Sequence, residues 1–264
     1  MKIINKTYNL SSNLNKSIVL ISDIHYENKS DIKHLNKILD NIRKIKPNYI
    51  CIPGDIIDKA DVRNFNQFII WLEKLTTITK VIVALGNHEF YKNKYKRIFE
   101  LNKENINKIK NINNLYLLDN SNLIIDNINF MGLTLPIDHY MEKSENKEDF
   151  KKYIKNIKVK DNYYNILLCH TPINIVKEDI IKGIDVNLIL CGHMHGGIVP
   201  NFLRKVFGHS GIISPSKHLF PSNVYGHIKM NDKDIIITSG IKMLPNRLKL
   251  FNNLLYSEIV IIKF

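Results

Sequence analysis

Short apolar runs separated by segments of helical periodicity constrain the fold of this 264-residue chain more than any other feature. Three runs rich in β-branched residues have the character of buried strands: SIVLIS (17–22), YICI (49–52) and KVIVAL (80–85). Segments 30–46 and 62–75 between them repeat apolar residues at helical spacing, and a further helix is expected across roughly 93–110. This strand–helix alternation predicts mostly parallel strands that are buried on both faces.

From about Leu115 onward the apolar runs stand closer together, as strands joined by turns do. NILLCH (165–170) and LILCGH (188–193) are two further strands, with a helical stretch expected near 172–182. The pattern predicts an α/β protein with a large, two-layered sheet. No internal repeat, low-complexity linker or change of composition divides the chain, so a single domain is expected over residues 1–264.

Charge and cysteine usage limit the partners and the compartment. The 38 Lys and Arg against 25 Asp and Glu give a net charge of +13, which favours anionic partners such as phosphate esters, nucleic acid or acidic lipids. The lysines are scattered, so no specific nucleic-acid partner is expected. Cys51, Cys169 and Cys191 form no CxxC pair and lie in or after apolar runs, which indicates buried thiols in a reducing compartment. A cytoplasmic location is expected, since no apolar leader or spanning run is present.

Polar side chains that can carry chemistry follow five of the predicted strands directly. They are Asp23 and His25, Asp55, Asn87 and His88, His170, and His193 and His195. Because the carboxyl ends of parallel strands border the ligand crevice of an α/β sheet, these five segments are expected to converge on one site.

The residue types indicate a metal centre. Asp, Asn and His suit Mn, Fe, Zn or Ni better than Ca, and the absence of a thiolate argues against a structural zinc site. Gly54, Gly86 and Gly192 precede three of the ligands and would allow sharp turns, while Gly196 and Gly197 would leave room for a phosphate. Seven ligands exceed the needs of one ion. They fit two ions that share a bridging carboxylate, the arrangement that clamps an in-line phosphoryl displacement.

The same residues carry a family resemblance. In order, SDIH, GDIID, GNHE, CH and GHMHGG resemble the motifs of the calcineurin-like metallophosphoesterases over roughly residues 18–197. The C-terminal part is similar to small bacterial phosphodiesterases, a subfamily that includes UDP-2,3-diacylglucosamine pyrophosphatase-like and cell-wall-associated members. The resemblance implies a four-layer α/β/β/α sandwich with a dinuclear metal centre.

Carried over residue by residue, the resemblance implies a role for each member of the set. One metal would be bound by Asp23, His25 and His195, and the other by Asn87, His170 and His193, with Asp55 bridging and His88 catalytic. The expected reaction is hydrolysis of a phosphodiester or pyrophosphate by a metal-bridging hydroxide, with Mn, Fe, Zn or Ni as the two divalent ions. Asp58 and Glu89 are expected to orient the ligands.

Two alternative functions remain open, and His139 and segment 200–223 are further candidates for contact with a substrate or partner. The charge of +13 favours a metal-dependent nuclease, although no dense basic run is present, and a non-catalytic scaffold is disfavoured because every motif position is filled. His139 is a candidate for substrate contact. Segment 200–223 mixes apolar and basic residues, which fits plain packing, a lid, or peripheral contact with an anionic membrane or a lipid-linked substrate.

Overall fold

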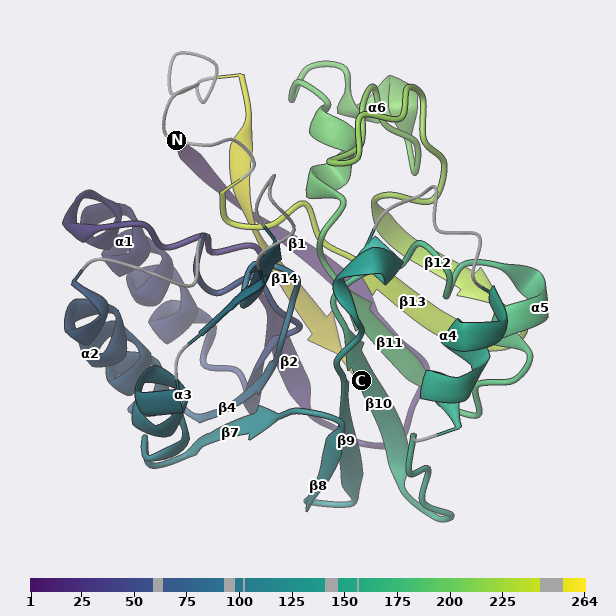
Figure 1. The fold of residues 1–264 in the computed structure, drawn as a ribbon, viewed down its shortest axis with the longest axis horizontal. Coiled ribbons are helices and arrows are strands. Elements are labelled where there is room, and N and C mark those ends of the chain that lie inside the picture. The colour runs from purple at the N-terminus through teal and green to yellow at the C-terminus, as the bar shows by residue number, and fades with distance from the viewer. Residues whose placement is uncertain (59–63, 93–97, 102, 141–146, 156, 243–253) are drawn as a thin grey trace.

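The structure, a computed structural model, describes residues 1–58, 64–92, 98–101, 103–140, 147–155, 157–242 and 254–264. Within these residues two six-stranded sheets are present, next to each other between one group of helices on the left and another on the right in Figure 1. The first has the order β1 (Lys2–Asn9), β14 (Tyr256–Lys263), β2 (Ser17–Leu20), β3 (Tyr49–Ile52), β4 (Lys80–Ala84) and β7 (Leu115–Leu118). The second has the order β12 (Gly226–Met230), β13 (Lys233–Ile237), β11 (Leu188–Cys191), β10 (Tyr164–Cys169), β9 (Ile128–Leu133) and β8 (Ser121–Ile125).

Both sheets are mixed, with a parallel centre. Strands β2, β3, β4 and β7 are parallel, as are β13, β11, β10 and β9, while β14, β12 and β8 supply antiparallel pairings. The carboxyl ends of the central strands of each sheet therefore finish at a common edge of that sheet. This edge carries the loops that hold the predicted ligands.

Alternation of side chains along each strand builds the layers. Ile18 and Leu20 of β2 join an apolar cluster shared with strands of the second sheet, whereas Val19 and the following Ile21 join a cluster shared with helices. The same two-residue period applies in β3, because successive side chains point to opposite faces. The fully apolar sequence of these strands follows from burial on both faces.

Helices cover the outer face of each sheet. Helices α1 (Lys29–Ile45), α2 (Phe65–Thr76) and α3 (Lys103–Lys110) contribute side chains to the cluster on the first sheet. On the second sheet, α4 (Lys147–Ile154) and α5 (Glu178–Ile181) contribute Phe150, Ile180 and Ile181. Helix α1 begins with a capping box formed by Asn28 and Asp31, which fixes its start near the predicted residue. The predicted four-layer α/β/β/α sandwich is confirmed.

Three local predictions differ from the structure. The helix expected across 93–110 is wrong in part: β5 (Phe90–Lys92) pairs with β6 (Ile98–Glu100) in a small antiparallel sheet, and only α3 is helical, while 93–97 and 102 lie outside the described residues. The stretch near 172–182 is helical only in α5, and residues 173–176 before it form turns. The first 9 residues contain β1, which no pattern in the sequence predicted.

The three cysteines are buried and free, as predicted. Cys51 lies in the cluster between the sheets, and Cys169 and Cys191 lie on the outer face of the second sheet. In the part of the chain that the structure describes, no helix has the length and apolar character needed to cross a membrane.

Candidate metal centre

The loops after β2 and β3 are joined to each other by backbone hydrogen bonds. Asp23 N–H donates to Gly54 O at 3.3 Å, and His25 N–H donates to Asp55 O at 3.1 Å. Asp23, His25 and Asp55 all have φ between 45° and 51°, a left-handed conformation that few residues other than glycine adopt. The joined loops hold the buried Asp23 and Asp55 carboxylates at the same edge of the first sheet.

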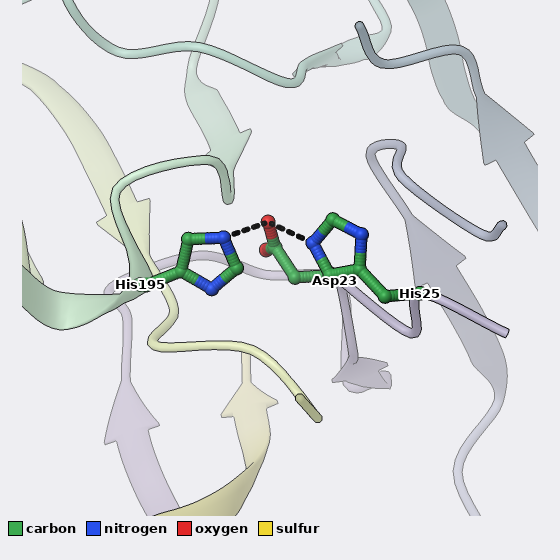
Figure 2. A group of neighbouring side chains, drawn as sticks. All are labelled: Asp23, His25 and His195. Atoms are coloured by element: carbon green, nitrogen blue, oxygen red, sulfur yellow. Dashed lines mark ion pairs between the residues drawn. The ribbon is translucent and has the colours of Figure 1, made fainter. Parts of the chain in front are cut away.

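Two imidazoles approach the Asp23 carboxylate from opposite sides (Figure 2). Its Oδ1 atom lies 3.8 Å from His25 Nε2 and 3.7 Å from His195 Nε2. These distances are too long for hydrogen bonds. Two ligand atoms that each lie ~2.1 Å from one ion are separated by at most ~4.2 Å, so each of these two pairs is within reach of a single ion. The donor atoms of all three residues lie within 4.8 Å of one another.

The Asp55 carboxylate lies close to three histidine rings. Its Oδ2 atom lies 2.9 Å from His170 Nε2, 3.7 Å from His25 Nε2 and 4.0 Å from His88 Nε2. One potential metal-binding group contains Asp55, His170 and His193, and another contains Asp55, His25 and His88, in each case with the donor atoms within 4.8 Å of one another. Asp55 therefore has histidine donors on two sides.

His193 is oriented by two hydrogen bonds. Its ring Nε2 contacts Tyr140 O at 2.9 Å, and its backbone N–H donates to Asp23 Oδ1 at 3.1 Å. A histidine that binds a metal usually donates its other ring N–H to such an acceptor, which leaves Nδ1 of His193 for an ion. Burial lowers the pKa of His193 to about 3, so the ring is neutral near pH 7, the form that binds metals.

Several buried donor and acceptor atoms in the centre have no hydrogen-bond partner. They are Asn87 Oδ1, both ring nitrogens of His25, and Nδ1 of His195. Buried polar atoms in native structures are nearly always hydrogen-bonded, so an unpaired group of this kind needs an explanation such as an ion. Burial also raises the pKa of the Asp23 carboxyl, because the protein interior disfavours its charge. A divalent cation would satisfy both the neutral donors and the buried carboxylates.

His88 adjoins the centre with part of its side chain, 29%, exposed. Its Nδ1 atom hydrogen-bonds to Asp58 O, so that Nε2 faces Asp55. Burial lowers the pKa of His88, but the Asp55 charge and the bond to Asp58 outweigh that effect and raise the pKa above the usual value. The Asp58 carboxylate lies 3.8 Å from His88 Nδ1 and 3.7 Å from His25 Nδ1, and the orienting role expected for it stays a prediction.

Glu89 binds the backbone that presents Asp55. Its buried carboxylate accepts N–H bonds from Gly86 at 2.6 Å, from Asp55 at 3.1 Å and from Ile56 at 2.9 Å. Burial and the adjacent Asp55 charge raise the pKa of Glu89 to about 7. Glu89 thus fixes two ligand-bearing loops to each other, as the sequence predicted.

Close approaches explain the glycines before the ligands. A Cβ at Gly86 would lie 2.3 Å from Asp55 Oδ1, and one at Gly192 would lie 2.4 Å from Asp23 Oδ2. At Gly196 and Gly197 the chain itself comes close: a Cβ at Gly197 would lie 2.3 Å from Gly211 Cα and one at Gly196 would lie 3.0 Å from Ser239 Cβ, so this pair permits tight packing. The expected room for a phosphate stays a prediction.

His139 and its neighbour Tyr140 show where sequence reasoning is less reliable. His139 is buried, with its ring 5.9 Å from that of Phe150 and 5.4 Å from that of Tyr153. Tyr140 is the residue that contacts the centre, with its ring 5.4 Å from that of His193. No motif marks Tyr140 in the sequence, because its contact with His193 forms only when the fold brings together residues that are 53 positions apart in the chain.

A buried network behind Asp23 was also missed. Glu258 of β14 accepts hydrogen bonds from Tyr225 Oη at 2.5 Å, from Thr238 Oγ1 at 3.0 Å and from Ser239 N–H at 2.9 Å. The turn that Glu258 holds ends in Gly240, where an added Cβ would lie 2.6 Å from Asp23 Cβ. Only a charged residue inside an apolar strand could have signalled this network in the sequence.

Comparisons with known proteins agree with this geometry. The profile of a family described as calcineurin-like phosphoesterase matches residues 16–197. A protein of Caenorhabditis elegans named as a metallophosphoesterase is 28% identical over 251 residues, 92% of this chain and 48% of that protein. An uncharacterized metallophosphoesterase of Campylobacter jejuni is 27% identical over 200 residues, 74% of this chain and 48% of that protein. The chain thus spans about half the length of these relatives.

A solved structure shares the fold. The crystal structure of TT1561 of Thermus thermophilus has a TM-score of 0.52 at 11% sequence identity and covers 86% of this chain and 91% of its own. At this identity the likeness concerns the fold alone.

Proposed function

Because the chain belongs to the calcineurin-like phosphoesterase family, we propose that it hydrolyses phosphate esters at a centre of two divalent metal ions. The observation that carries the proposal is the meeting of two Asp/His groups around Asp55, with buried donor atoms that lack partners. A phosphodiester or a pyrophosphate is the preferred substrate class. Manganese is the first metal to test, followed by iron, zinc and nickel.

The proposed ligand sets follow the two sides of Asp55. One ion would be held by Asp23, His25 and His195 and the other by Asn87, His170 and His193, with Asp55 shared between them. Support for the bridge comes from Asp55 Oδ2, which lies near His25 of the first set and His170 of the second. The bound ions supply Lewis acidity toward the phosphoryl oxygens.

His88 is the proposed general acid. With Nδ1 bonded to Asp58 O, the ring is fixed so that Nε2 points into the centre, and its partial exposure leaves it accessible to a substrate. As the bond from phosphorus to the leaving oxygen breaks, the proton on His88 Nε2 passes to that oxygen. The raised pKa of His88 favours the protonated ring that this step requires.

Metal analysis of the purified chain, coupled to a hydrolysis panel, tests the proposal. The panel contains a generic phosphodiester, a phosphomonoester, a nucleotide-sugar pyrophosphate and single-stranded DNA, each with Mn²⁺ and with chelator. We expect bound metal and chelator-sensitive hydrolysis of a diester or pyrophosphate in the wild type and in the control His227→Ala, whose ring pairs with Asp234 on the second sheet. His25→Ala should lose both properties.

The same panel separates the alternatives. Preferential cleavage of DNA would favour the nuclease, which the charge of +13 suggests. Bound metal without hydrolysis of any substrate in the panel would favour the scaffold. Absence of both metal and hydrolysis would overturn the proposal.

A further inference from the structure

Exposed apolar side chains concentrate in segment 200–223. Phe202, Val206, Leu219 and Phe220 are 73, 80, 59 and 70% exposed. Elsewhere in the described residues, the exposed large apolar side chains are limited to Ile70, Ile124 and Leu254, each below 50%. A concentration of exposed apolar side chains on a protein surface marks a contact site rather than ordinary surface.

Segment 200–223 is attached directly to the metal centre. Ile212 and Ile213 donate their N–H groups to Gly197 O at 2.9 and 3.1 Å, and the Arg204 guanidinium donates to Gly196 O. Gly196 and Gly197 immediately follow His195. In Figure 1 the helix of this segment, α6 (Arg204–Phe207), lies at the same end of the molecule as the carboxyl ends of β10 and β11. The exposed side chains are therefore presented on a surface fixed to the candidate site.

The sequence around these side chains carries positive charge only. No Asp or Glu stands between Asp185 and Asp232, although the chain contains 25 acidic residues. Lys205 and Lys217, next to the exposed apolar residues, are themselves exposed. Apolar side chains that project beside lysines are the composition of surfaces that insert shallowly into anionic bilayers.

A groove of about 300 Å³ adjoins this surface. Its apolar lining includes Ile173, Val176 and Met194, the last of which stands between the candidate ligands His193 and His195. Pro221, which follows Phe220, lines its other side. The lining also includes Lys177 and His218, so the groove combines apolar and basic side chains. A phosphate headgroup with the first part of its acyl chains fits this combination, which favours lipid over an acidic protein as the partner.

We propose that segment 200–223 docks the protein onto an anionic lipid bilayer, with Phe202, Val206, Leu219 and Phe220 inserted among the lipids and Lys205 and Lys217 at the headgroups. Docking stands apart from the proposed hydrolysis, because it uses none of the candidate ligands. It would bring the groove and the metal centre to lipid-linked phosphate esters.

Vesicle co-sedimentation of the full chain in chelator tests the docking. We expect the wild type to sediment with phosphatidylglycerol-containing vesicles and not with phosphatidylcholine vesicles, and to dissociate as salt increases. Phe202→Ser/Val206→Ser and Leu219→Ser/Phe220→Ser should each lower partitioning at least tenfold. The control Ile70→Ser/Ile124→Ser removes two exposed apolar side chains elsewhere and should sediment like the wild type.

Two charge-reversal variants distinguish docking through this segment from general attraction of a basic protein to an anionic membrane. Lys205→Glu/Lys217→Glu should abolish sedimentation, whereas Lys33→Glu/Lys37→Glu makes the same change of net charge on exposed residues of α1 and should retain most of it. Equal losses in the two charge variants, or in the two kinds of apolar variant, would overturn the proposal. Failure of the wild type to bind anionic vesicles would also overturn it and leave an acidic protein as the partner.

Hydrolysis of a water-soluble diester, measured on the same variants, keeps the two proposals distinct. Docking variants should hydrolyse it at the wild-type rate, because the substituted side chains are outside the metal centre. Loss of vesicle binding with full hydrolysis supports docking, while vesicle binding without any hydrolysis would retain docking and contradict the proposed function. Loss of hydrolysis in the docking variants would contradict a surface that acts only in docking.

Discussion

Five of the seven candidate ligands have a left-handed backbone conformation. Asp23, His25, Asp55, His193 and His195 have φ values of 51°, 45°, 51°, 65° and 47°. A conformation of this kind costs of order 1 kcal/mol or more per residue and persists where the surroundings enforce it. Here the enforcing contacts are visible, since Asp23 and Asp55 carboxylates accept the N–H groups of His193 and His88. The carboxylates of two candidate ligands thus help to hold the strained turns around them.

His88→Ala should separate catalysis from metal binding. The variant keeps the proposed ligands and removes the group that donates the proton to the leaving oxygen, so turnover should fall by ~10²–10⁴-fold with metal content unchanged. Turnover and metal content would be measured on the same preparation, with His227→Ala as the control for loss of a partly exposed histidine that contacts a carboxylate. Wild-type turnover in metal-replete His88→Ala would remove His88 from the mechanism.

Gly86→Ala should weaken metal binding without removing any ligand. The new methyl group would lie 2.3 Å from Asp55 Oδ1 and 2.9 Å from His170 Cδ2, so both ligands must move. We expect metal affinity at least tenfold lower in a chelator competition. Gly183→Ala is the matched control, because its Cβ would meet only Ile180 O at 3.5 Å. Equal affinities in the two variants would show that the close approach at Gly86 has no functional consequence.

Strands and long helices could be predicted from the sequence, whereas short or long-range elements could not. The apolar runs that form β2, β3 and β4 are buried on both faces, so their composition alone identifies them. Strand β1 is half exposed and pairs with β14 at the opposite end of the chain, so no local signal marks it. Strand β6 lies in a stretch that the sequence predicts to be helical. It is a strand because it pairs with β5, next to a hydrogen bond from Leu101 N–H to Glu89 O, and local periodicity does not indicate such a pairing.

In the candidate site, too, some residues are marked by a local motif and others are brought there only by the fold. The structure brings the candidate ligands together as the sequence indicated, because each follows a strand within a short motif, while their binding of metal stays a prediction. Tyr140, Arg204 and Glu258 could not be predicted, because their contacts join segments 8 to 53 residues apart in the chain.

Arg204 should control the order of segment 200–223. Its guanidinium stacks on Tyr225, 4.4 Å from the ring centroid, and donates to Gly196 O and Ser210 O. Arg204→Ala removes these contacts, so the bonds from Ile212 and Ile213 to Gly197 O should open more often. Amide hydrogen exchange at those two residues should accelerate at least tenfold, equivalent to about 1.4 kcal/mol.

The neighbouring Lys205→Ala serves as the control for that experiment, because Lys205 is exposed. Unchanged exchange at Ile212 and Ile213 in Arg204→Ala would show that other contacts hold the segment.

At the scale of the whole molecule, the centre joins the two sheets. Asp23 and Asp55 follow β2 and β3 of the first sheet, and His170 and His193 follow β10 and β11 of the second. The apolar cluster between the sheets supplies packing, and at this edge the candidate ligand His170 of the second sheet lies 3.8 Å from Asp23 and 2.9 Å from Asp55 of the first. Two expectations at this scale stay predictions: that residues 1–264 form one domain and that the protein is cytoplasmic.

Metal removal should therefore lower the stability of the whole molecule. An ion that binds only the folded chain, at 100 times its dissociation constant, stabilises it by ~2.7 kcal/mol. For a chain of this size that free energy corresponds to a decrease in Tm of roughly 5–10 °C on adding chelator. Calorimetry with and without chelator would measure the difference.

Asp55→Asn provides the decisive comparison for that measurement. Because Asp55 is the proposed bridge, its amide variant should bind metal poorly and show a Tm that chelator does not change. Asp234→Asn, which alters a carboxylate paired with His227 on the second sheet, should keep the wild-type response. If chelator lowers the Tm of Asp55→Asn as much as that of the wild type, then the ions are held without Asp55 and the bridge between the two sheets has been assigned to the wrong residue.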